Sequence, residues 1–87
     1  MINRFLLKEF GSRIRQLRTA LKLSQEQLSF ITGFHRTYIG MIERGERNIS
    51  LTNIAIFAKA FDMTIDQLLK FDNSQVLLKQ YQYKSES

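Results

Sequence analysis

Apolar residues recur at helical spacing from the first stretch of the chain. Leu7, Phe10, Ile14, Leu17 and Leu21 follow one another at steps of three or four residues. This spacing predicts one amphipathic helix with a single apolar stripe. Phe5 and Leu6 precede the stripe and are expected to fold back onto the core.

Two short helical patterns come next, over about 25–32 and 36–44. Each has an apolar face, made by Leu28 with Ile31 and by Ile39 with Ile42. Signals for helix ends frame both patterns. Ser24 and Gln27 form a capping box, whereas Gly33 and Gly45 stand where the two helices must end.

The remaining apolar residues predict two further helices. Ser50 is an N-cap residue ahead of a face formed by Leu51, Ile54, Ala58 and Phe61. Thr64 and Gln67 make a second capping box ahead of Ile65, Leu68 and Leu69. The chain is therefore predicted to be all-α, with five helices in one domain over 1–72. Residues 73–87 suit either a short helix or a strand, and form a tail that is partly disordered or part of a dimer interface.

Composition narrows the function class. The 87 residues carry a net charge of +5, and all of the excess lies in residues 1–48, with nine Lys and Arg against four Asp and Glu. Such a bias suits a surface that faces phosphate, although a generic solvated basic face is an equal explanation. With no cysteine, no apolar run of membrane-spanning length and no signal peptide, the chain is expected to be soluble and cytoplasmic.

Candidate catalytic chemistry is sparse. His35 is the single histidine, and no second ligand stands near it at metal spacing. No Gly-rich phosphate loop or Ser/His/Asp arrangement occurs. We therefore predict no enzyme, no metal, no cofactor and no small-molecule effector.

The two short helices joined at Gly33 have the helix-turn-helix design, in which the second helix lies in the DNA major groove. A helical wheel at about 100° per residue turns Thr37, Met41 and Arg44 outward and puts Arg36 and Tyr38 on the flanks. Gly40, a poor helix former, lies beside the outward face. Either close approach to DNA or a tight helix crossing would explain it.

Residues from about Leu7 to Leu69 resemble the Cro/repressor-type, XRE-like helix-turn-helix family, whose fold is the five-helix lambda-repressor-like domain. The resemblance rests on Gln25, Leu28, Gly33, Ile39, Ile42, Glu43 and Gly45. The segment RTYIGMIERGERNIS, with the opening FLLKEF, resembles more narrowly the controller proteins of restriction–modification systems. Four positions depart from the usual pattern: Ser29, Phe30, Phe34 and Asp62, the last of which replaces a glycine.

The resemblance implies roles for individual residues. Base-reading positions are Arg36, Thr37, Tyr38 and Met41. Phosphate contacts are Gln25, Arg44, Arg47 and Asn48, and we place His35, at the start of the same helix, with them. Arg18 and Glu43 match a partly buried ion pair.

The resemblance also implies a homodimer on palindromic double-stranded DNA, joined through the fifth helix and the residues after it. The corresponding residues are Ile65, Leu68, Leu69 and Phe71, which could instead close the monomer core. We predict a sequence-specific transcription regulator. A restriction–modification controller and a phage-type repressor both fit, and an antitoxin that binds a toxin through 74–87 is the alternative.

Overall fold

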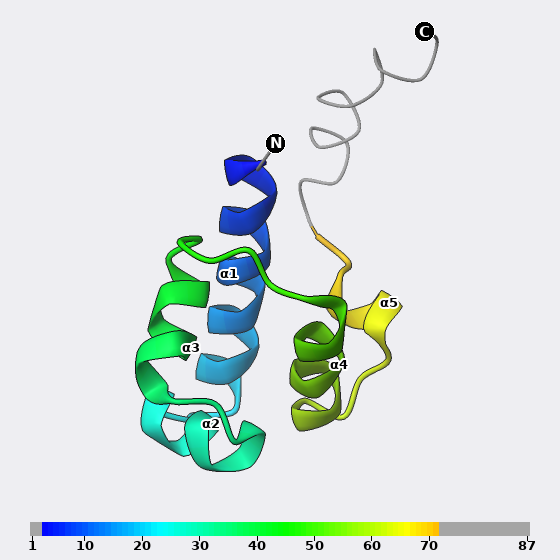
Figure 1. The fold of residues 1–87 in the computed structure, drawn as a ribbon. Helices are drawn as coiled ribbons and strands as arrows, with labels where there is room; N and C mark the ends of the chain where they lie inside the picture. The colour runs from blue at the N-terminus through cyan, green and yellow to red at the C-terminus, as the bar shows by residue number, and fades with distance from the viewer. Residues whose placement is uncertain (1–2, 72–87) are drawn as a thin grey trace, which may run out of the picture.

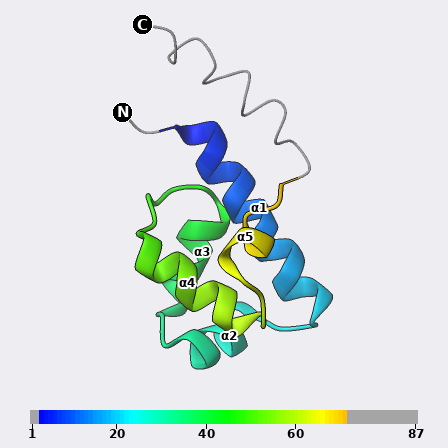
Figure 2. The same ribbon diagram turned by 90° about the vertical axis from the view of Figure 1, so that its right-hand side faces the viewer.

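Five helices make up the part of the chain that the computed structural model describes, residues 3–71. They are α1 (Arg4–Ala20), α2 (Gln25–Thr32), α3 (Arg36–Glu43), α4 (Leu51–Ala60) and α5 (Ile65–Leu68). The predicted all-α fold is confirmed over this range. In Figure 1, α3 lies on one side of α1, and α4 and α5 lie on the other; Figure 2 shows α5 and α4 in front of α3. The predictions for 73–87 concern residues outside the described range.

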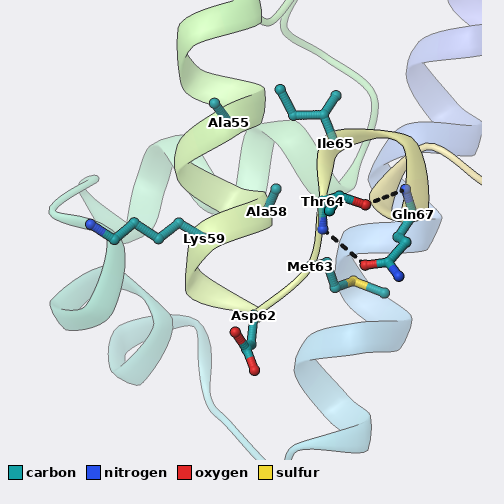
Figure 3. Close-up of a pocket in the computed structure, with 8 residues that line it drawn as sticks. All are labelled: Ala55, Ala58, Lys59, Asp62, Met63, Thr64, Ile65 and Gln67. Atoms are coloured by element: carbon teal, nitrogen blue, oxygen red, sulfur yellow. Dashed lines mark hydrogen bonds between the residues drawn. The ribbon is translucent and has the colours of Figure 1, made fainter.

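The helix ends lie where local sequence signals put them. Both capping boxes are present, with Ser24 and Thr64 accepting from the backbone N–H groups of Gln27 and Gln67. Figure 3 shows the second box, in which the Gln67 side chain returns to the Thr64 backbone. Gly33 ends α2 with φ +83°, a left-handed conformation that costs glycine nothing. The elements therefore form largely from short-range chemistry.

The core draws on all five helices. Six side chains are less than 2% exposed: Ile14, Leu28, Ile39, Ile42, Phe57 and Leu68. Phe10 contacts Phe57 edge to face, with ring centroids 6.3 Å apart. Edge-to-face pairs stabilise a core beyond the area that they bury. Among residues 3–71, no helix has both the length and the apolar character needed to cross a bilayer.

The crossing of α1 and α3 depends on Gly11. A Cβ atom at this position would lie 2.3 Å from the carbonyl oxygen of Ile42 and 2.6 Å from that of Glu43. Backbone cannot yield as a flexible side chain can, so only glycine permits α1 to lie this close to the end of α3. The sequence pattern did not reveal this requirement.

Arg13 ties α5 to α1. Its Nε donates to the carbonyl oxygen of Leu68 and its Nη2 to that of Gln67, at 3.0 and 2.9 Å. Both carbonyls lie at the end of α5, and that of Gln67 also accepts from the Lys70 N–H. A four-residue helix gains little from its own hydrogen bonds, so this tether helps to fix its position.

Four expectations about apolar residues were wrong. Phe5 and Leu6 do not fold back, because Asn3 caps α1 and extends it to include them. Leu21, Ile31 and Leu51 are 56%, 53% and 69% exposed rather than on the core face. Leu21 and Leu51 stand at helix ends, beyond the reach of the packed helices. Ile31 lies about 60° from Leu28 on the side away from Thr32, and the buried arc of α2 runs toward Thr32.

The ends of α1 and α4 use residues other than glycine in the left-handed region. Lys22 and Asp62 have φ of +59° and +56°. At the end of α4, the N–H groups of Asp62 and Met63 donate to the carbonyls of Lys59 and Ala58, which is a Schellman motif. The motif explains why the family usually has glycine at position 62, and it makes Asp62 a locally strained residue.

We expect Asp62→Gly to stabilise the protein by about 0.5–1 kcal/mol. The free energy gained by removing the left-handed strain at position 62 is larger than the free energy lost because glycine makes the unfolded chain more flexible. Thermal unfolding monitored by circular dichroism measures this, since 1 kcal/mol corresponds to about 4–8 °C in a domain of this size.

Asp62→Ala is the control, because it removes the carboxylate but keeps the Cβ atom. It should be no more stable than the parent. Equal stabilisation by both variants would mean that the charge, and not the backbone conformation, is responsible.

Candidate nucleic-acid interface

The two sides of α3 differ sharply in exposure. Ile39 and Ile42 are 0% and 1% exposed. Arg36, Thr37 and Arg44 are exposed, and Met41 is half-buried. The predicted division of α3 is therefore confirmed, and its outer side offers a guanidinium, a hydroxyl and a thioether within two turns.

His35 caps the beginning of α3. Its Nδ1 accepts a hydrogen bond from the Thr37 N–H at 3.0 Å. An accepting Nδ1 assigns the ring proton to Nε2 in the neutral tautomer. The exposed imidazole thus stabilises the helix and keeps one N–H donor for an outside acceptor.

A buried ion pair connects the end of α3 to α1. Arg18 Nε and Nη2 donate to the two carboxylate oxygens of Glu43 at 2.6 and 3.0 Å, and the two side chains are only 12% and 4% exposed. Arg18 Nη1 donates to the carbonyl oxygen of Leu23, and Gln25 Nε2 donates to Glu43. The hydrogen bond that Arg18 donates to Glu43 raises the pKa of Arg18. This network, Arg18–Glu43–Gln25, joins α1, the start of α2 and the end of α3.

Tyr38 differs from the other three base-reading candidates. Its side chain is half-buried, its hydroxyl accepts from Asn53 Nδ2 of α4 at 3.0 Å, and its ring lies 5.0 Å from that of Phe34. Phe34 in turn lies 5.2 Å from Phe57, so a line of rings runs from the core to the surface. Arg47 ends the line, with its guanidinium 5.3 Å over the Tyr38 ring. No sequence signal singled out Asn53.

Gly40 makes room for polar side chains. A Cβ atom there would first meet Arg44 Nη1 at 3.2 Å and then the Gln25 amide at 3.6 and 3.7 Å. The nearest atoms are thus not the backbone of a neighbouring helix, and the explanation by a tight helix crossing was wrong. The missing side chain lets Gln25 and Arg44 gather over the outer side of α3.

The phosphate candidates surround this side of α3. Gln25 is half-buried at the start of α2, whereas Arg47 and Asn48 are exposed in the loop after α3. Two of the cations have acidic neighbours. Arg36 lies 4.0 Å from Glu26, and Arg44 pairs with Glu46 at 2.9 Å. Within residues 3–71, no three His, Cys, Asp or Glu residues lie together in a way that could hold a metal ion.

Comparison with known proteins identifies the family of this chain. A model of the helix-turn-helix family HTH_3 matches residues 14–68. The chain belongs to this family. It is 50% identical over 59 residues to control protein C.SmaI of Serratia marcescens, covering 68% of this chain and 70% of that protein.

Two solved structures extend the likeness. The restriction-modification controller protein C.AhdI from Aeromonas hydrophila is 52% identical, with a TM-score of 0.68 over 71% of this chain and 94% of that one. Controller protein C.Esp1396I, solved as a tetramer in complex with its natural 35 base-pair operator, is 26% identical. Its TM-score is also 0.68, over 87% of this chain and 93% of that one. This HTH_3 protein is a DNA-binding regulator of transcription.

The candidate dimer residues of the HTH_3 domain separate into two groups. Leu68 is 0% exposed and closes the monomer core, so its assignment to a dimer interface was wrong. Ile65 and Leu69 are each 36% exposed, and Phe71 is half-buried. Leu69 and Phe71 line an apolar cavity of about 180 Å³, together with residues of α1 that include Leu6. The apolar surface that remains is therefore smaller than the sequence implied.

We expect Arg18→Met to destabilise the HTH_3 domain far more than Arg15→Met. Removing Arg18 leaves the buried Glu43 carboxylate without its cation, which costs about 3–5 kcal/mol, whereas Arg15 is exposed. Urea unfolding of the two variants gives the comparison directly.

The double variant Arg18→Met, Glu43→Leu removes both charges and should regain much of the lost stability. If Arg18→Met and Arg15→Met unfold at the same urea concentration, the ion pair contributes nothing to the stability of the fold.

Proposed function

We propose that this protein is a homodimeric controller of a restriction–modification system that binds a palindromic DNA site by inserting α3 into the major groove. The observation that carries the proposal is the outer side of α3. It is exposed, bears the base-reading candidates and is surrounded by donors for phosphate. The 50% identity to a control protein supports the choice of controller.

The chemistry of this side of α3 suits base edges. The Arg36 guanidinium can donate to guanine O6 and N7 together, and the Thr37 hydroxyl can donate or accept. Both stand in the first turn of α3, the part of a recognition helix that contacts bases. Half-buried Met41 offers only apolar contact, which suits a thymine methyl group.

The surrounding donors suit the DNA backbone. Gln25, His35, Arg44, Arg47 and Asn48 come from three separate segments: the start of α2, the start of α3, and the end of α3 with the loop after it. Contacts to phosphate on both sides of a helix fix its register in the groove without reading sequence. Tyr38 holds Arg47 by stacking, so we assign Tyr38 to positioning this loop as well as to the DNA surface.

Dimerisation would place two copies of α3 on one site. One domain offers few base contacts, and a two-fold dimer doubles them on a palindrome. The apolar residues left on the monomer surface, Ile65, Leu69 and Phe71, lie on the α5 side of α1, away from α3 (Figure 1). Contact through them would leave both recognition helices free.

The protein is proposed to act in the cytoplasm, by binding alone and without catalysis. The antitoxin alternative depends on residues 74–87, which lie outside the described range. To distinguish the two functions, the DNA site that the protein binds is first selected from random DNA. The genes beside that site in the genome are then identified. A controller's site lies beside methyltransferase and endonuclease genes, whereas an antitoxin's site lies beside a toxin gene.

We expect Arg36→Ala to weaken binding to the selected site by about 1–3 kcal/mol and to relax discrimination at one base pair per half-site. Arg47→Ala should weaken binding to every sequence alike and lower the salt slope by about 1 per protomer. Titrations of the site and its single-base variants over a range of salt measure both effects. A uniform loss in Arg36→Ala would move Arg36 to the phosphate contacts.

We expect Leu69→Glu to dissociate the dimer. A carboxylate at this position would be buried against its copy without a partner. Phe30→Glu is the matched control, since Phe30 is 79% exposed on α2 and lies outside the proposed interface. Sedimentation equilibrium distinguishes them. Dissociation by Phe30→Glu alone would move the dimer contact to α2.

A further inference from the structure

An exposed carboxylate stands among the phosphate candidates of the loop after α3. Glu46 lies in the loop after α3, between Arg44 and Arg47, where its negative charge opposes an approaching DNA backbone. Glu46 and Arg44 are both largely exposed, at 51% and 58% of their side-chain surface. The fold therefore does not require this ion pair. The geometry of the pair needs another explanation.

The pairing has the form that Arg uses for phosphate. Arg44 Nε donates to one carboxylate oxygen of Glu46 at 2.9 Å, and Nη2 donates to the other at 3.1 Å. Two parallel bonds from the planar fork are the arrangement in which guanidinium recognises carboxylate and phosphate alike. The hydrogen bond from Arg44 also lowers the pKa of Glu46, so this carboxylate stays ionised at neutral pH.

The third nitrogen of the Arg44 guanidinium, Nη1, also has a defined position. Nη1 lies over Gly40, 3.2 Å from where a Cβ atom would be, and the Gln25 amide lies over the same glycine. Arg44 thus lies back along the outer side of α3, beside another phosphate candidate. Its fork is occupied by a carboxylate from two residues further along the chain.

We propose that Glu46 is a built-in substitute for a DNA phosphate, which occupies Arg44 in the free protein and must release it when DNA binds. The inference rests on the proposed function, because it assumes that this side of α3 faces DNA. Binding is then an exchange in which a phosphate replaces the Glu46 carboxylate on the same two N–H donors.

The exchange has a defined consequence. Because phosphate contacts carry no sequence information, the competing carboxylate lowers affinity for every DNA by the same factor. It also cancels one positive charge per protomer, which lowers the salt dependence. The contact of Arg36 with Glu26 is a single approach at 4.0 Å, so Glu26 should compete much less.

The test is a double-mutant cycle on DNA affinity. Glu46→Gln is compared with Asp62→Asn, which removes the same charge at the turn between α4 and α5, outside the proposed DNA surface. Glu46→Gln and Arg44→Gln are made alone and together, and Asp62→Asn is made alone. Affinities are measured for the selected operator and for an unrelated duplex between about 50 and 200 mM salt, the range over which phosphate contacts dominate. Melting temperatures verify that each variant folds.

We expect Glu46→Gln to raise affinity about three- to tenfold on both duplexes and to steepen the salt slope by about 1 per protomer. Asp62→Asn should change affinity less than about twofold, since salt screens charges beyond about 8–10 Å. In the Arg44→Gln background, the effect of Glu46→Gln should fall to the level of Asp62→Asn.

Two results would overturn the inference. If Glu46→Gln raises affinity equally with and without Arg44, the carboxylate acts only as a general charge. If Glu46→Gln weakens binding, Glu46 orients Arg44 toward DNA instead of competing for it. Failure of the proposed function would differ from failure of this inference, because the unmodified protein would then show no preference for any duplex.

Discussion

The structure depends on the buried pair of Arg18 and Glu43. Glu43 is the last residue of α3, where a negative charge opposes the helix dipole and where burial removes water. Arg18 compensates both costs with two hydrogen bonds, and its third nitrogen fixes the carbonyl of Leu23. The pair therefore sets the angle of α3 to α1 and, through Gln25, the position of the α2 terminus.

Packing around this pair leaves α3 little freedom. Gly11 brings the backbone of α1 against the last carbonyls of α3, so sterics and electrostatics act at the same end of the helix. At the other end, His35 caps α3, and the rings of Phe34 and Tyr38 connect it to the core. A helix fixed at both ends presents its outer side chains on a rigid support, which reading base edges requires.

The two proposed surfaces share α1. Its Arg18 holds α3, and its Arg13 holds the carbonyl end of α5. Figure 1 shows α3 on one side of α1 and α5 on the other. The relative placement of the two proposed surfaces is therefore fixed through one helix. That is the geometry a protein needs if the spacing of its half-sites is to be constant.

The sequence by itself determined the helices, their ends and the family, because caps, left-handed turns and the spacing of apolar residues act over a few positions. Ser24 with Gln27, Thr64 with Gln67, and Gly33 needed no tertiary information. The wheel of α3 also succeeded, since one face of a central helix must be buried. Tertiary structure decided which apolar residues stay outside: Leu68 is buried while the adjacent Leu69 is exposed, and Ile31 falls outside the buried arc of α2. It also decided the partners of Arg13 and Tyr38, as well as the need for glycine at position 11. These depend on which helix lies across which, and contacts between residues distant in sequence leave no local pattern to read.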